Sequence, residues 1–139
     1  SMNENLVDIL ISQHNNLRRE MAEIKGRADE PAPNFAAIFF GLEEFGKSLA
    51  DHLKLEDGVF YPKLLQRLEG QGTNTGDTRK FIDEMRKIKE QVYDFLGKYG
   101  AVEKIEKNFE SFKLDLNEMI AVLFIRIYSE ENGVYLYWK

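Results

Sequence analysis

One stretch, residues 42–62, constrains the fold of this chain more than any other. Apolar residues recur there at alternating steps of three and four, which is the spacing of one face of an α-helix. The same face carries His52 and Glu56, which lie one helical turn apart. Burying either group without a partner costs several kcal/mol. The stretch therefore predicts a buried helix whose polar pair is satisfied by a metal ion, by each other or by polar groups from other helices.

Four amphipathic segments joined by short polar loops predict that residues 1–139 form a single domain. Only three prolines, together with abundant Leu, Glu and Lys, favour helix throughout. We expect Asn3 or Asn5 to cap the first helix, which ends near residue 25, and Pro62 to kink the second. The later helices are expected at residues 35–69, 77–96 and 102–135. This pattern is typical of an all-α, up-down-up-down four-helix bundle.

Composition excludes several classes of function. The chain has no cysteine, so disulfides, thiolate catalysis, iron–sulfur clusters and cysteine-ligated zinc are excluded. A net charge of −5 argues against nucleic acid as a partner. The longest apolar run, residues 119–125, is too short to span a membrane, and no secretory signal precedes the first amphipathic segment. With no P-loop, Ser–His–Asp arrangement or HExxH motif, we expect a soluble cytoplasmic protein that is not an enzyme.

Polar residues interrupt two further apolar stripes. His14 lies in the middle of the first stripe, and Glu131 or its neighbour Glu130 follows the apolar run of the last helix. The segment EDGVFY at residues 56–61 is echoed by ENGVYL at residues 131–136, and this register matches Glu131 to Glu56. The stripe of the third helix contains no histidine or carboxylate; it consists of Phe81, Met85, Ile88, Val92, Phe95 and Tyr99.

A lone inward His in helix one, followed by HLKLEDGVFYP in helix two, resembles the hemerythrin family, the HHE cation-binding domain. The resemblance covers nearly the whole chain in helix number and order. It implies a four-helix bundle around a di-iron centre with about five histidines and two carboxylates. It also implies four metal ligands in this chain, His14, His52, Glu56 and Glu131. The third-helix histidines of the family are missing here, and Ile127 replaces the fourth-helix histidine.

With only two histidines in the chain, the full di-iron centre cannot be built. In the family, the histidines of the third and fourth helices hold one iron, and all of these are missing here. The histidines of the first two helices and the two carboxylates hold the other iron, and their counterparts remain. The hypothesis is therefore a single ion, iron or else zinc or manganese, with apolar residues filling the other half of the site. The resemblance then implies metal or redox sensing, or regulation, rather than oxygen transport.

The alternative is a metal-free protein in which the His–Glu pair is a buried hydrogen bond. Arg18 and Arg126 are the candidate counter-charges. Tyr128 lies beside the expected site, either as a phenolate ligand of ferric iron or as an ordinary boundary residue. The chain would then act as a helical interaction module.

Apolar surface supports such a module. Residues 35–40 and 119–125 are apolar on more than one face, which predicts a homodimer or a regulatory protein partner. The aromatic tail of Tyr135, Tyr137 and Trp138 is either an interface patch or a cover over the open end of the bundle. Residues 48–72 also resemble bacterial anti-sigma regulators of the Rsd/AlgQ type, which bind the primary sigma factor. That resemblance depends on a short segment of Leu68, Glu69, Gly70 and Gly72.

Overall fold

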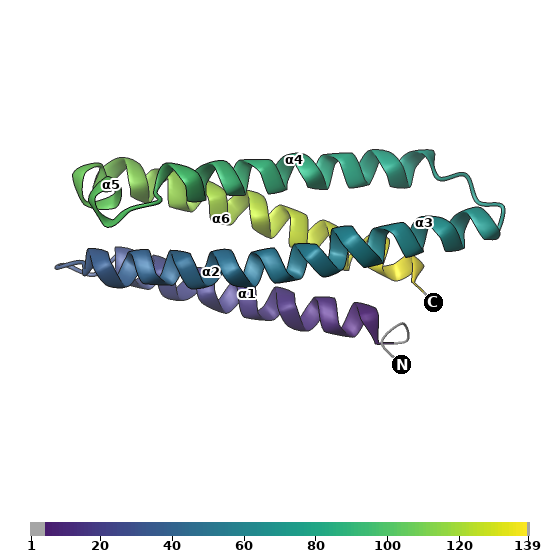
Figure 1. Ribbon diagram of the computed structural model, residues 1–139, viewed down its shortest axis with the longest axis horizontal. Coiled ribbons are helices and arrows are strands. Elements are labelled where there is room, and N and C mark those ends of the chain that lie inside the picture. The colour runs from purple at the N-terminus through teal and green to yellow at the C-terminus, as the bar shows by residue number, and fades with distance from the viewer. Residues whose placement is uncertain (1–4, 139) are drawn as a thin grey trace.

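The computed structural model describes residues 5–138 and shows long helices running side by side (Figure 1). The two ends of the described part of the chain lie at the same end of the molecule. Helices α1, α2, α4 and α6 form the bundle, so the predicted all-α architecture is confirmed. The elements are α1 (Leu6–Ala28), α2 (Phe35–Leu55), the π turn η1 (Glu56–Phe60), α3 (Tyr61–Gly70), α4 (Gly76–Lys98), α5 (Val102–Lys107), α6 (Phe109–Glu131) and the 3-10 turn η2 (Val134–Tyr137).

The start of α2 is set by a local hydrogen bond. The side chain of Asn34 caps α2 by accepting a hydrogen bond of 3.0 Å from the backbone N–H of Ala37. Asn5 precedes α1 but makes no capping side-chain bond to any described residue, and Asn3 lies outside the described residues. The helix expected at residues 77–96 is present as α4, which begins one residue earlier, at Gly76.

The second predicted helix is present, with an irregular turn in its middle. Between α2 and α3 the backbone N–H of Tyr61 donates to the carbonyl of Glu56, five residues earlier, which makes a π turn. Pro62 follows at the start of α3. Proline has no backbone N–H, so in the middle of a regular helix it would remove one of the backbone hydrogen bonds. The chain thus passes Pro62 with one wide turn, and Glu56 lies within that turn.

The fourth predicted helix is interrupted twice, so the expectation of one helix over 102–135 is corrected. Asn108 separates α5 from α6 and leaves the helical conformation, with φ −126° and ψ 40°. Its side chain donates to the carbonyl of Lys104, at 3.2 Å. After α6, Gly133 turns the chain back so closely that a Cβ there would lie 2.5 Å from the carbonyl oxygen of Ser129. Glycine is required at this turn, which leads into η2.

The core consists of two hydrophobic clusters with a polar layer between them. The larger cluster packs α1, α2, α4, α5 and α6 around side chains such as Phe45, Val92 and Phe112. The smaller cluster joins α1, η1, α3 and η2 around Leu10, Phe60 and Leu64. The buried polar side chains between the clusters are His14, His52, Glu56, Arg126 and Glu130.

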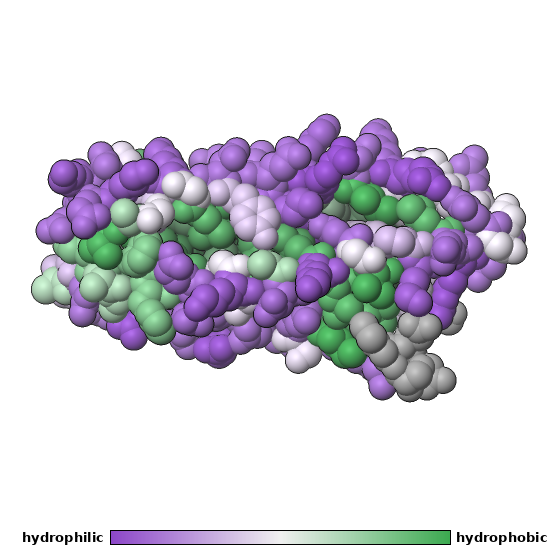
Figure 2. All heavy atoms as spheres, viewed as in Figure 1, coloured by the Kyte–Doolittle hydropathy of each residue, from purple (hydrophilic) through white to green (hydrophobic). Residues whose placement is uncertain are grey.

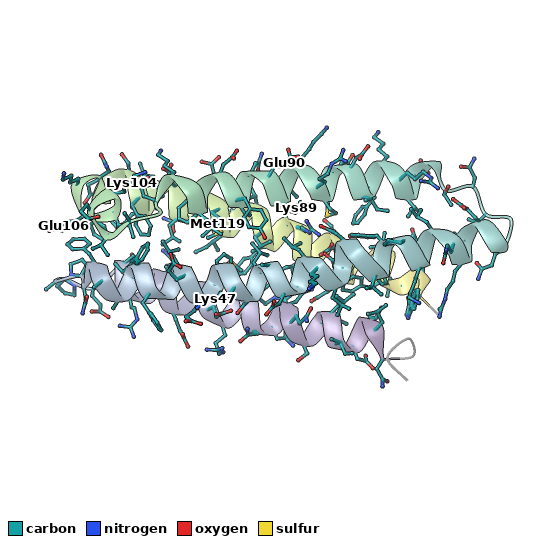
Figure 3. The ribbon with its side chains drawn as sticks, in the orientation of Figure 1. Lys47, Lys89, Glu90, Lys104, Glu106 and Met119 are labelled. Atoms are coloured by element: carbon teal, nitrogen blue, oxygen red, sulfur yellow. The ribbon has the colours of Figure 1, made fainter. Side chains whose placement is uncertain are left out.

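On the face shown in Figure 2, hydrophilic residues cover most of the helices, and hydrophobic residues show along the seam between α2 and α4. Glu90 and Lys104 are exposed on the outer side of α4 and α5 (Figure 3). Among the apolar residues expected at the surface, Phe40, Phe124 and Ile125 are exposed by 64%, 44% and 57%. Within residues 5–138, no helix combines the length and the apolar character needed to cross a membrane.

Candidate metal site

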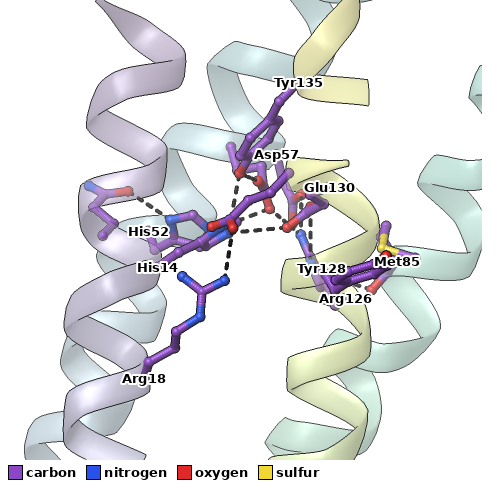
Figure 4. A network of polar contacts seen from close by, with 12 residues as sticks. His14, Arg18, His52, Asp57, Met85, Arg126, Tyr128, Glu130 and Tyr135 are labelled. Atoms are coloured by element: carbon purple, nitrogen blue, oxygen red, sulfur yellow. Dashed lines mark hydrogen bonds and ion pairs between the residues drawn. The ribbon is translucent and has the colours of Figure 1, made fainter. Parts of the chain in front are cut away.

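Four metal-ligating side chains meet in the polar layer (Figure 4). His14 comes from α1, His52 from α2, Glu56 from the π turn and Glu130 from the end of α6. Each offers one nitrogen or oxygen atom, and these atoms all lie within 4.8 Å of one another. All four side chains are buried, with at most 2% of their surface exposed. The bundle thus brings together two imidazoles and two carboxylates from four separate elements.

The two histidines are held in the same orientation by residues outside this group. Nδ1 of His14 donates to Glu131 at 2.8 Å, and Nδ1 of His52 donates to Gln13 at 2.7 Å. Nε2 of His14 consequently faces Oε1 of Glu130 at 3.2 Å, and Nε2 of His52 faces Oε1 of Glu56 at 3.5 Å. Metal-binding histidines are held in this way, with one nitrogen hydrogen-bonded and the other directed at the ion.

Arg126 lies on the other side of the two carboxylates, toward α4. Its guanidinium donates to Glu56 at 2.6 Å, to Glu130 at 3.3 Å and to Asp57 at 3.3 Å. Nη1 donates to the backbone carbonyl of Met85 at 2.9 Å, and only 2% of the residue is exposed. Met85, Val92 and Ile127 are buried on this side as expected. The guanidinium of Arg126, a candidate counter-charge in the sequence analysis, lies there as well.

Two tyrosine hydroxyls complete the network. Tyr61 donates to Oε2 of Glu130 at 2.5 Å. Tyr135 donates to Oε2 of Glu56 and lies 3.2 Å from Nε2 of His14. Tyr128, which the sequence placed beside the site, is 69% exposed. The aromatic tail is divided, because Tyr135 is buried in the smaller hydrophobic cluster while Tyr137 is 56% exposed.

Burial and neighbouring charges set the protonation of the site. Burial and the charge of His52 lower the pKa of His14 to about 4, so this imidazole is neutral at pH 7. Burial and the charge of Glu56 raise the pKa of Glu130 well above its ordinary value. Burial opposes ionisation of Glu56 as well, but the hydrogen bond and charge of His52 and the charge of Arg126 hold its pKa below the usual range. The lowered pKa makes Glu56 the charged partner of Arg126, and the raised pKa of Glu130 favours its protonated form.

One oxygen of Glu130 indicates whether the residues of this site suit a metal ion. Among the described residues, Oε1 is a fully buried atom without a hydrogen-bond partner. It lies 3.2 Å from Nε2 of His14, whose own proton is on the opposite nitrogen, so a proton on Glu130 or a cation is needed between these two atoms. Beside them lies a cavity of about 10 Å³, lined by both histidines and Glu130, which has room for one small ion or water. Two nitrogens and two oxygens are a suitable ligand set for iron, zinc or manganese.

Three of the four predicted ligands lie in this group, and the fourth does not. His14, His52 and Glu56 are brought together, whereas Glu130 takes the place expected for Glu131. Glu130 lies one turn after Arg126 on the buried face of α6. Glu131 points to the rim, where it accepts hydrogen bonds from His14 and from Arg18, both at 2.8 Å.

Several residues of the network were missed by the sequence analysis. Gln13 and Asp57 adjoin predicted ligands in the chain, but neither lies on the apolar stripe of its helix. Tyr61 follows Glu56 by five residues, and the sequence analysis expected regular helix there. The π turn changes the direction of the Tyr61 side chain relative to a regular helix. For Tyr135 the sequence contained one indication of its position, because Gly133 lies two residues earlier and marks a turn after the helix.

Comparison with protein families gives one match that covers nearly all of the chain. The family is the hemerythrin HHE cation-binding domain, and the match extends over residues 5–137. No curated protein and no solved structure matches the chain. The resemblance stated from the helix-one His and the HLKLEDGVFYP segment is confirmed.

Proposed function

Because the chain belongs to the hemerythrin HHE cation-binding family, we propose that it binds a single transition-metal ion in the polar layer. The proposed ligands are His14, His52, Glu56 and Glu130, and the ion is iron, zinc or manganese. One observation carries the proposal most strongly. Oε1 of Glu130 is buried, lacks a hydrogen-bond partner among the described residues and faces a lone pair of His14. A buried polar atom of that kind requires a proton or a cation.

Each residue contributes a definite property. His14 is neutral, and in both histidines Nδ1 donates to a neighbour, Glu131 or Gln13, which leaves Nε2 directed at the site. Glu130 loses its proton when it acts as a ligand, so binding releases a proton and weakens at low pH. Arg126 already neutralises one buried carboxylate, which leaves a pocket suited to a single ion. Bound iron would supply a one-electron change between ferrous and ferric states.

We propose sensing or regulation, rather than oxygen transport or catalysis, as the role of this site. The chain has two histidines, so it lacks the ligands that a second iron of the family requires. The space on the α4 side is taken by the guanidinium of Arg126, which is fixed by Glu56 and the carbonyl of Met85. Both features support a mononuclear site.

The test is the metal content of protein purified without a metal-affinity tag and then reconstituted anaerobically with ferrous iron, zinc or manganese. We expect about one equivalent by mass spectrometry in the wild type. His52→Ala should lose it, and Glu20→Gln, which changes a partly buried carboxylate elsewhere on α1, should keep it. Two equivalents of iron would contradict the mononuclear site, and no metal in any reconstitution would contradict the proposal.

A metal-free interaction module is the second candidate function. Phe124, Ile125 and Tyr128 leave one stretch of α6 apolar and exposed, which favours a second copy or a regulatory protein as partner. On this alternative the polar layer is a relic, and His14→Leu should be tolerated or even stabilising. Light scattering after size-exclusion chromatography should show a dimer that Ile125→Glu dissociates. A monomer in both proteins would contradict self-association.

A further inference from the structure

The hydroxyl of Tyr135 lies among the proposed ligand atoms, although the proposed function gives it no role. It donates to Oε2 of Glu56 and lies 3.2 Å from Nε2 of His14. These two atoms belong to ligands from different elements, the π turn and α1. An oxygen within hydrogen-bond distance of both ligands is also within reach of an ion that both ligands bind.

Packing holds Tyr135 in this position. Its ring stacks on the imidazole of His14, with centroids 5.4 Å apart and planes at 15°. Phe60 meets the ring edge-on at 5.2 Å and 83°, and only 3% of Tyr135 is exposed. The close turn at Gly133 directs η2 back toward the site. Tyr135 is therefore a preorganised donor from a segment that follows Glu130 in the chain.

We infer that Tyr135 is a fifth ligand of the proposed site and that it makes the site selective for ferric iron over zinc. This inference rests on the proposed function. A phenolate is a hard, anionic oxygen donor, which suits a small trivalent cation better than zinc, a borderline-soft ion. As a ligand, Tyr135 would give up to solvent the proton that its hydroxyl now donates to Oε2 of Glu56. Oε2 of Glu56 would then be free to serve as a ligand as well.

Tyr61 provides a matched comparison in the same network. Its hydroxyl is also buried and also donates to a carboxylate ligand, Glu130, at 2.5 Å. The oxygen that it contacts, Oε2, also accepts a hydrogen bond from Nε of Arg126, whereas Oε1 is the oxygen that faces His14. Tyr61 therefore lies on the arginine side of Glu130, and we expect it to remain a hydrogen-bond donor.

The experiment loads wild type, Tyr135→Phe and Tyr61→Phe with ferric nitrilotriacetate and removes the excess. Wild type should hold about one iron per chain and show a visible phenolate-to-iron charge-transfer absorption. Tyr135→Phe should remain folded by circular dichroism, lose this absorption and bind ferric iron at least about tenfold more weakly. Its zinc affinity should fall much less. Tyr61→Phe should keep the absorption.

Five outcomes would overturn the inference. If wild type binds one iron without a visible charge-transfer band, and Tyr135→Phe binds equally well, the ligand role fails and the proposed function stands. A band that is lost in Tyr61→Phe, or kept in both variants, assigns the phenolate to another residue. Equal losses of zinc and ferric affinity in Tyr135→Phe show a structural role only. A wild type that binds neither metal overturns this inference together with the proposed function.

Discussion

On the α4 side of the polar layer, Arg126 faces Glu56 across 2.6 Å, whereas on the α1 side His14 faces Oε1 of Glu130 across 3.2 Å, and Arg126 reaches only the other oxygen of Glu130. Both sides bury a glutamate completely. The first side neutralises its carboxylate with a residue of the chain, and the guanidinium finds further acceptors in Asp57 and Met85. The second side leaves Oε1 of Glu130 unmatched among the described residues.

This difference separates a structural ion pair from a binding site. A buried charge is costly unless it is paired and hydrogen-bonded. The α4 side, here called the arginine side because Arg126 pairs with Glu56 there, meets both conditions. The α1 side, here called the histidine side because His14 faces Glu130 there, meets these conditions only when a proton or a metal lies between Glu130 and His14. Substitutions on the arginine side should therefore change stability, and those on the histidine side should chiefly change metal affinity.

The largest effect is expected for Arg126→Met. Removing the guanidinium leaves Glu56 buried without its counter-charge, which should lower the free energy of unfolding by about 3–5 kcal/mol. Urea denaturation in the presence of a chelator measures this change. A loss below about 1 kcal/mol would show that the arginine side does not depend on the ion pair.

The two glutamates should respond differently to the same substitution. Glu56→Gln removes the charged partner of Arg126 and should cost about 2–3 kcal/mol of stability in metal-free protein. The raised pKa of Glu130 favours its protonated form, so Glu130→Gln should cost less than about 1 kcal/mol and yet abolish metal binding. Urea denaturation and metal titration of both variants test the contrast. Equal stability losses would contradict the assigned protonation states.

Acid should destabilise the metal-free protein through His14. The folded pKa is lowered to about 4, below the value of the unfolded chain, so the unfolded state binds more protons between the two values. Stability from this group is present above the unfolded pKa and falls as the pH drops toward 4. The loss should be roughly 2 kcal/mol between pH 6.5 and 5. Urea denaturation at both pH values should show a smaller loss in His14→Asn.

The smallest effect is expected for Glu131→Gln on the rim. The substitution weakens the acceptor that orients His14, so metal affinity should fall about tenfold, or about 1.4 kcal/mol. The stability of the metal-free protein should change little, since Glu131 and its partner Arg18 are partly exposed. Competition with a chelating dye gives the affinity. Complete loss of binding would instead place Glu131 among the ligands.

The sequence determined the helices and the faces that they bury. The spacing of three and four placed His14, His52 and Glu56 in the core, because one helix fixes the relative directions of its own side chains. The family could be recognised on the same residues and is confirmed. The absence of ligands on the third helix also followed from its apolar stripe.

Tertiary structure decided which residues meet across helices. Arg126 and Ile127 are both buried, so helical spacing alone did not distinguish Glu130 from Glu131. The π turn brought Tyr61 to Glu130, and the turn at Gly133 brought Tyr135 to Glu56. Helical periodicity describes one element at a time, whereas these contacts join residues that are 69 and 79 positions apart. Packing between elements, and the need to satisfy buried charges, selected them.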